Sequence, residues 1–444
     1  MQLSGDNILL LTADEFHDLM ASMNIGRPNN IAVAVSGGGD SMALTLLLNQ
    51  WCLKKNIKLN AVTVDHSLRK ASKQEAENVS TWLRQHKIDH EVIEWVGKKP
   101  QSNIQDAARE ARYKLINQWC SERKIQHLFV AHHKDDQAET FFIRLLRGSG
   151  VDGLSAMKPI SLMPHPLSHK NDVKLYRPLL SIGKERLLKT LDEFKQRWIS
   201  DPSNENENFT RIKVRKLLEN SEIEGLDRDK LAATAEKMSR VKSLLDELTD
   251  QAESDYVQLN PLGYAELSQY FYENLHEEIS LRLLSRLLKK ISGGTHPTRY
   301  QKLLSLYESI KKPDFAGQTL AGVIIFKTDT GQITFVREAA SIKDNKVITG
   351  MKQYLWDNRF LINAKPNSGT LLPFSEDLML VLNRESPAIK DEIFQNFKSH
   401  ILRDKVLPSL PVILTSDQKV ILPKLLCSDK NNNSDRAFSA SFQL

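Results

Sequence analysis

A run of glycines near the start of the chain carries the clearest chemical signal. It follows the apolar run Ile31 to Val35 and precedes the leucine-rich stretch Met42 to Lys54, so the order predicts a strand, a tight turn and a helix. Glycines let backbone N–H groups approach phosphate oxygens, and the start of a helix adds partial positive charge. The residues that we assign to phosphate binding are Ser36, Gly37, Gly38, Gly39, Asp40 and Ser41. Asp40 is a predicted Mg²⁺ ligand. An ordinary turn, the alternative, needs only one glycine.

The glycine segment differs from two common nucleotide-binding loops. No Gly-Lys-Ser or Gly-Lys-Thr follows it, and it does not fit the pattern G-x-G-x-x-G. P-loop ATPases and Rossmann dehydrogenases are therefore disfavoured.

A second candidate site follows the apolar run Leu128 to Ala131. Asp135, Asp136 and Glu139 lie at the start of a predicted helix, and the spacing of four places Asp135 and Glu139 on one face. Such carboxylates bind Mg²⁺ or a cationic amine, although acidic residues also complement the dipole of an ordinary helix. We assign Asp136 to the metal together with Asp40.

Other side chains near these two segments are further candidates. Arg112 is suited to pairing with phosphate or with the acidic cluster, and a solvated helix face is the alternative. Asp65 and His66 end a predicted strand, and the sequence leaves open whether Asp65 contacts a nucleoside or orients His66. His132 and His133 are weaker candidates, with His133 the weaker of the two, because a histidine at a strand end is more often structural.

These residues need a scaffold that brings them together. Over the first 150 residues, β-like apolar runs alternate with helical stretches. The predicted strands are 31–35, 59–64, 90–95 and 128–131, and the predicted helices are 42–54, 72–87, 104–123 and 135–147. This alternation predicts an α/β fold with a parallel sheet covered by helices on both faces. The candidate residues follow the carboxyl ends of the strands, where ligands of such sheets bind.

The rest of the chain changes character twice. After an ATP-binding catalytic domain at 1–220, leucine stripes predict a mainly helical domain at 221–343, which closes with β-like runs at 322–327 and 333–336. Residues 344–444, with runs at 354–362, 379–382, 412–415 and 420–422, resemble a small α+β domain, and residues 429–435 read as disordered. In the helical domain, Arg282, Arg286 and Lys289 form a basic stripe that is either a solvated face or a nucleic-acid contact.

Composition sets broad limits on function. The chain has 444 residues, and 61 Lys and Arg against 55 Asp and Glu give a net charge of +6, which favours a polyanionic partner without deciding it. The three cysteines form no C-x-x-C pair, the first residues lack a secretory pattern, and no apolar run approaches the ~18 residues of a membrane span. We therefore expect a cytoplasmic protein with no membrane segment.

Several motifs together resemble one family. The segment Ser36 to Ser41 resembles the pyrophosphate-binding loop of the PP-loop ATP pyrophosphatase superfamily, whose fold is adenine nucleotide alpha hydrolase-like. Further segments are similar to the tRNA(Ile)-lysidine synthetase family up to about residue 216. They are Val64 to Arg69, Ala107 to Tyr113, Ala131 to Thr140, Arg147 to Gly150, Arg177 to Leu179 and Asp201 to Asn204.

The resemblance implies a carbon–nitrogen ligase. Members of this family use ATP to adenylate the 2-carbonyl oxygen of the wobble cytidine in a CAU-anticodon isoleucine tRNA. The amine of free L-lysine then displaces AMP, which changes decoding from AUG to AUA. The implied roles are catalysis for Asp40, Asp136 and Arg112, ATP binding for Ser36 to Ser41, Asp65 and His66, lysine binding for Asp135, Asp136 and Glu139, and tRNA binding for Arg144, Arg147, Arg211 and Arg215.

The chain departs from the family pattern in places. Where the family usually has Arg-Asn-Arg-Ile-Arg, this chain has Arg211-Ile212-Lys213-Val214-Arg215, which leaves Arg211 and Arg215 as the safer phosphate contacts. Ser67 stands where a glycine is common.

Two other functions compete with this one. A different PP-loop enzyme, such as a tRNA thiolase or an amide synthetase, would need a cysteine pair or an ammonia supply that the sequence does not indicate. A scaffold that binds tRNA or nucleotide without activity would not need Asp40, Asp135 and Asp136, which are all present. The sequence is compatible with a homodimer and does not set the oligomeric state.

Overall fold

The computed structural model describes residues 9–67, 72–97, 104–164, 173–200, 210–220, 223–294, 297–348, 353–363, 369–385, 393–395, 397–423, 426 and 438–443. The chain forms two compact units, residues 1–243 and 244–444. The motif Asp201 to Asn204 and the predicted tail at 429–435 lie outside the described residues. In the ranges given above, no helix is both long enough and apolar enough to cross a membrane. Whether the second unit comprises two domains stays a prediction.

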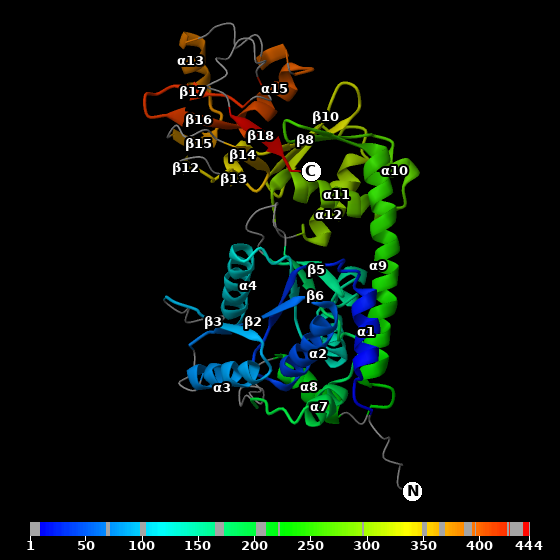
Figure 1. Cartoon of the computed structure of the whole chain (residues 1–444). Coiled ribbons are helices and arrows are strands. Elements are labelled where there is room, and N and C mark those ends of the chain that lie inside the picture. Colours follow the sequence, from blue (N-terminus) through cyan, green and yellow to red (C-terminus); the bar gives the residue numbers. More distant parts are fainter. Residues whose placement is uncertain are drawn as a thin grey trace. The chain divides into compact units, whose positions relative to one another are not determined.

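The first unit is built on a six-stranded sheet with the order β3-β2-β1-β4-β6-β5 (Figure 1). Every neighbouring pair is parallel except β5 with β6. Its strands are β1 (Asn30–Ala34), β2 (Lys58–Asp65), β3 (Asp89–Glu94), β4 (His127–Phe129), β5 (Ile160–Leu162) and β6 (Lys174–Tyr176). Its helices are α1 (Ala13–Ser22), α2 (Gly39–Lys55), α3 (Ser72–Gln85), α4 (Ile104–Glu122), α5 (Lys134–Leu146), α6 (Val151–Leu154), α7 (Lys184–Glu193) and α8 (Thr210–Asn220).

The sheet buries both of its faces. Along β1, Ile31 and Val33 pack into the core beneath α1, α2 and α7, whereas Ala32 between them packs into a separate core with Ile116 and Trp119 of α4. Because successive side chains of a strand point to opposite faces, a strand covered on both faces must be apolar at its buried positions, as Ile31, Ala32 and Val33 of β1 are. The α/β fold with a parallel sheet, predicted from the alternating runs, is confirmed.

The second unit contains more strand than expected. After the long helix α9 (Arg228–Tyr256), a five-stranded antiparallel sheet β7-β8-β11-β10-β9 packs against α11 (Glu277–Ser292). Its strands are β7 (Val257–Asn260), β8 (Tyr264–Leu267), β9 (Gly317–Leu320), β10 (Val323–Lys327) and β11 (Ile333–Arg337). The other helices of this part are α10 (Phe271–Asn274) and α12 (Tyr300–Ile310). Two of the five strands, β10 and β11, were predicted.

The last part of the chain holds two small sheets, β12-β15-β16-β17 and β13-β14-β18. Their strands are β12 (Lys346–Ile348), β13 (Gln353–Trp356), β14 (Phe360–Asn363), β15 (Gly369–Pro373), β16 (Pro411–Thr415), β17 (Val420–Ile421) and β18 (Ser439–Phe442). The run 379–382, which the sequence left unassigned within an α+β domain, lies in the helix α13 (Glu376–Glu385), and a short helix α15 (His400–Val406) precedes β16. A single apolar run of four residues does not distinguish a buried strand from a helix turn.

The predicted basic stripe of α11 is engaged within the protein. Arg286 pairs with Asp250 and Glu253 of α9, and Arg282 lies 2.8 Å from Glu278. The Arg286 pairs join α9 to α11 and the pair of Arg282 with Glu278 lies within α11, so neither arginine is an unpaired cation.

Candidate active site

The glycine segment lies where the strand order of the sheet reverses. From β1 the chain passes through α2 to β2 on one side, and it later enters β4 on the other side of β1. The turn after β1 and the turn after β4 therefore leave the same edge of the sheet next to each other. Open parallel sheets bind ligands at this kind of switch point.

The carbonyl groups of the glycine turn are held by the protein. The Val35 carbonyl accepts a hydrogen bond from Oγ1 of Thr63 (2.7 Å), and the Gly37 carbonyl accepts one from the N–H of Ile199 (2.9 Å). The Gly38 carbonyl accepts a third from Oγ of Ser41 (2.9 Å). In contrast, the N–H groups of residues 37 to 39 make no hydrogen bond to any other residue that the structure describes. Backbone donors thus remain free for a ligand.

The three glycines differ in the space that a side chain would find at each position. Gly37 has φ +86°, and a Cβ there would lie 2.6 Å from Ile199 and 2.8 Å from Val79. A Cβ on Gly39 would lie 2.7 Å from Leu188 of α7. A Cβ on Gly38 would meet only Oγ of Ser36, at 3.6 Å. Packing therefore excludes side chains at Gly37 and Gly39, whereas at Gly38 the space is open.

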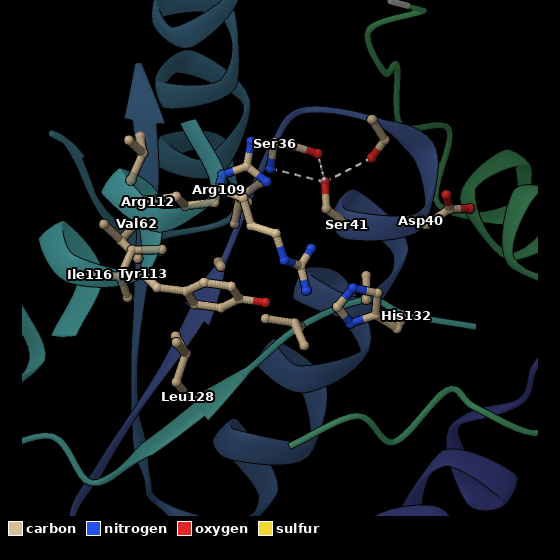
Figure 2. A pocket seen from close by; sticks show the side chains of 16 residues that line it. Ser36, Asp40, Ser41, Val62, Arg109, Arg112, Tyr113, Ile116, Leu128 and His132 are labelled. Carbon is tan, nitrogen blue, oxygen red and sulfur yellow. Dashed lines mark hydrogen bonds between the residues drawn. The ribbon is translucent and has the colours of Figure 1, made fainter. Parts of the chain in front are cut away.

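A hollow of about 230 Å³ adjoins this turn (Figure 2). Its apolar walls include Val62, Val64, Ile116, Leu128 and Val130. Its polar lining includes Ser36, Gly38, Asp40, Ser41, Arg109, Arg112 and His132. Ser41 accepts a hydrogen bond from the N–H of Ser36 and contacts its hydroxyl, both at 3.2 Å, as the dashed lines in Figure 2 show. A hollow with apolar walls beside guanidinium and amide donors suits a flat base joined to phosphates.

His133 lies at the centre of the acidic residues. Its side chain is 4% exposed, and its Nε2 atom is 3.5 Å from Oδ2 of Asp40 and 3.5 Å from Oδ2 of Asp136, while Nδ1 is 3.7 Å from Asp135. Burial by itself lowers the pKa of His133, but these three carboxylates outweigh it and raise the pKa to about 10. The residue is therefore a buried cation that holds two predicted Mg²⁺ ligands near each other.

His132 differs from its neighbour. It lines the hollow, and burial lowers its pKa to about 4 despite the nearby charge of Asp136. A neutral imidazole thus faces the hollow while a charged one lies behind it.

The predicted lysine-binding carboxylates are paired with arginines. Glu139 is 1% exposed and accepts hydrogen bonds at 2.6 Å from Nε of both Arg211 and Arg215, which belong to α8. Arg211 also donates to Asp136 at 2.6 Å. Two arginines that we assigned to tRNA thus contact two carboxylates that we assigned to lysine.

Asp135 has its own arginine partner. Its Oδ2 atom lies 3.1 Å from Arg228 at the start of α9, and the N–H of Lys184 approaches Oδ1 at 3.4 Å. Burial raises the pKa of Asp135, but His133, Arg228 and this N–H together lower it to about 2. Asp135 is therefore a firmly ionised group.

The other predicted residues lie in two places. Arg144 donates to the carbonyls of Gly153 (2.7 Å) and Ala156 (2.9 Å), whereas Arg147 ends α5 and is exposed. Beside the hollow, Arg112 donates to Nε2 of His66 at 3.2 Å.

Asp65 contacts Ser67 at the end of β2. It accepts a hydrogen bond from the N–H of Ser67 at 2.8 Å, and Ser67 has φ +50°. That conformation explains why a glycine suits position 67.

Two residues of this site were missed or ranked too low. The roles of His133 and Arg228 depend on contacts with residues far along the chain, and only the acidic residues next to His133 gave a signal in the sequence.

Comparison with known proteins identifies a matching family and similar enzymes. Residues 11–222 match the PP-loop domain family. The tRNA(Ile)-lysidine synthase of Wolbachia pipientis wMel is 33% identical over 413 residues, which are 92% of this chain and 91% of that protein. The enzyme of the same name from Orientia tsutsugamushi is 30% identical over 420 residues, 92% of each chain. Among solved structures, a U34-tRNA thiolase from Methanococcus maripaludis aligns with 51% of this chain and 80% of that one, at 18% identity and a TM-score of 0.42. These relatives, which cover 92% of the chain, place it in the tRNA(Ile)-lysidine synthase family.

Proposed function

We propose that the chain uses ATP to join L-lysine to the wobble cytidine of a CAU-anticodon isoleucine tRNA, with AMP and pyrophosphate as products. The glycine turn carries this proposal, because the carbonyls of Val35, Gly37 and Gly38 are bonded to the protein, while the N–H groups of Gly37, Gly38 and Gly39 have no partner among the described residues and Gly38 lines the hollow. That arrangement suits the phosphates of a nucleotide at a helix start. The substrates follow from family membership.

The reaction has two balanced steps. The 2-carbonyl oxygen of the cytidine bonds to the α-phosphorus of ATP and pyrophosphate leaves. The lysine nitrogen first loses the extra proton of its ammonium form to the solvent. It then bonds to C2 of the activated base, the C–O bond to AMP breaks, and the nitrogen releases a further proton to the solvent. In both steps charge changes on phosphate oxygens, and Arg109 and Arg112 line the hollow where these oxygens would lie. The turn binds and orients the nucleotide rather than reacting with it.

The acidic cluster is the proposed lysine site. Asp135 and Asp136 are ionised, since His133 and the adjacent arginines lower the pKa of each carboxyl below its usual value despite burial. An ammonium group bound there would replace Arg211 as the partner of Asp136, or Arg228 as the partner of Asp135. Glu139 is buried beneath Arg211 and Arg215, so its proposed effect on lysine binding is indirect, through the positions of these two arginines.

A Mg²⁺ ion fits at Asp40. Oδ1 of Asp40 is buried and has no hydrogen-bond partner among the described residues, which leaves one carboxylate oxygen uncommitted next to the glycine turn. Asp136, held by the same histidine, is the second proposed ligand. When bound, the ion neutralises charge on the phosphates. Cytoplasmic tRNA, free lysine and ATP are the proposed partners, and a homodimer stays a prediction.

One assay tests the whole proposal. The protein is incubated with ATP, labelled lysine and unmodified isoleucine tRNA that carries CAU, and a matched tRNA with uridine at the wobble position serves as control. We expect one lysine per cytidine-bearing tRNA and equal amounts of AMP and pyrophosphate. Pyrophosphate release without lysine incorporation would favour another PP-loop reaction, and the absence of both would favour a scaffold.

A further inference from the structure

The first peptide of the glycine turn is fixed from both sides. The carbonyl of Val35 accepts from the Thr63 hydroxyl at 2.7 Å, and the N–H of Ser36, in the same peptide group, donates to Oγ of Ser41 at 3.2 Å. Val35 and Thr63 are 3% and 8% exposed, so water does not readily replace the hydroxyl. The orientation of this peptide decides where the following N–H groups point.

A histidine lies directly behind Thr63. Nε2 of His90, in β3, is 2.8 Å from Oγ1 of Thr63, and its Nδ1 is 2.9 Å from Oγ of Ser80 in α3. A carbonyl can only accept, so Thr63 must donate its one proton to Val35 and must accept from His90. His90 therefore carries its proton on Nε2, and Nδ1 accepts from Ser80.

The three side chains form a directed chain of hydrogen bonds. Each group donates towards the turn, from Ser80 to His90, from His90 to Thr63 and from Thr63 to the Val35 carbonyl. Successive bonds of this kind strengthen one another in a buried setting. The Ser80 hydroxyl also lies 3.0 Å from the carbonyl of Ala76, so this outer link has an alternative partner. The inner links through His90 and Thr63 are the ones that fix the turn.

We infer that His90 and Thr63 are positioning residues for ATP, which orient the glycine turn from behind without touching the nucleotide. Without Thr63, the Val35 carbonyl loses its donor and the peptide is held only through the Ser36 N–H, so its carbonyl oxygen can turn towards the hollow, where it repels phosphate. The inference rests on the proposed function in one respect only, namely that the ligand of the glycine turn is ATP. None of the residues that we assigned to the site from the sequence belongs to this chain of hydrogen bonds.

The test compares five variants by ATP affinity and by the KM values for ATP and for lysine. We expect Thr63→Val and His90→Phe each to raise the dissociation constant and the KM for ATP about tenfold, the loss of one buried hydrogen bond. Thr63→Ser keeps the hydroxyl and should stay near the wild type. Because the links act in series, the double variant should be no worse than Thr63→Val alone. His127→Phe is the matched control, since His127 is also partly buried but bonds to Tyr176 at the start of β4, at the opposite end of that strand from the site. The KM for lysine should not change in any of them.

The result separates the inference from the proposed function. A wild-type protein that binds ATP but makes no lysidine contradicts the proposed substrates and leaves this inference testable by ATP affinity. A wild-type protein that binds no ATP contradicts both. The inference itself is overturned if Thr63→Val binds ATP like the wild type, or if Thr63→Ser is as defective as Thr63→Val, since a role in packing alone predicts no rescue. Thermal unfolding of each variant shows that it is folded.

Discussion

Nε2 of His133 lies 3.5 Å from the carboxylate of Asp40, although Asp40 begins the first helix after the glycine turn and His133 precedes α5. The same nitrogen lies 3.5 Å from Asp136, so one buried imidazolium lies between two carboxylates that would otherwise repel each other. It thereby ties the turn after β1 to the turn after β4.

Replacing Asp40 should separate adenylation from tRNA binding. Asp40→Asn removes the charge of the proposed Mg²⁺ ligand and should reduce pyrophosphate release roughly 10²- to 10³-fold, the range for loss of one transition-state electrostatic contact. Affinity for tRNA, measured by filter binding, should stay within several-fold. A variant that still turns over near the wild-type rate would show that Asp40 holds no metal.

The three glycines should respond differently to alanine. Gly38→Ala places a methyl group in open space, so the free energy of unfolding should change by less than about 1 kcal/mol while ATP affinity falls at least about tenfold. Gly37→Ala, with φ +86° and contacts below 3 Å, should lower the free energy of unfolding by about 1 to 3 kcal/mol. Urea denaturation and ATP titration distinguish the two. If Gly38→Ala lowered the free energy of unfolding as much as Gly37→Ala does, the space beside Gly38 would not be open.

Glu139 should matter for stability as well as for lysine. Glu139→Gln leaves Arg211 and Arg215 without their shared carboxylate, and the free energy of unfolding should fall by about 3 kcal/mol, as for a broken buried ion pair. Glu219→Gln is the matched control: its carboxylate is 47% exposed and pairs with Arg228, so the change should be below about 1 kcal/mol. Similar values for the two would mean that the cluster adds nothing to stability.

The two arginines of α5 should have separate roles. Arg147→Ala removes an exposed cation, so tRNA affinity should fall several-fold and the salt dependence should become shallower by about one charge. Arg144→Ala removes two hydrogen bonds to backbone carbonyls and should mainly lower the melting temperature. Binding titrations at several salt concentrations test both, and an unchanged salt slope for Arg147→Ala would remove it from the tRNA surface.

His90 should make folding stability depend on mildly acidic pH. Burial lowers the pKa of His90 to about 4, slightly opposed by Glu91, so the unfolded chain binds the proton more tightly. Stability is therefore complete above about pH 6.5 and is lost as the pH falls towards 4, by about 1 to 3 kcal/mol. His90→Gln should show a shallower fall in this window by urea denaturation. Parallel curves for the two proteins would show that folding does not shift the pKa of His90.

The sequence predicted the first unit better than the second for physical reasons. Strands such as β1 and β2 are buried along most of their length and appear as mainly apolar runs of β-forming residues, and the helix between them is long. In the second unit, β7 and β9 are short and only partly buried, so they left no run to detect. The turn residues Ser36 to Ser41 were identifiable because their types and order are local.

The electrostatic partners in the site were not identifiable from the sequence. Arg211 follows Glu139 by 72 positions, and Arg228 follows Asp135 by 93. Only the fold brings these charges together. A residue such as Arg211 therefore looks like a solvent-facing cation in the sequence, although it contacts a carboxylate that is almost fully buried.

The bonded carbonyls of the glycine turn also limit which protein oxygens could bind a metal ion. With those oxygens bonded to Thr63, Ile199 and Ser41, a bare divalent ion finds mainly the free oxygen of Asp40, and within the described ranges no three His, Cys, Asp or Glu side chains are grouped to complete its shell. Water or the phosphates of a nucleotide would have to supply the remaining ligands. We therefore expect free Mg²⁺ to bind weakly here and to bind more tightly when ATP is present.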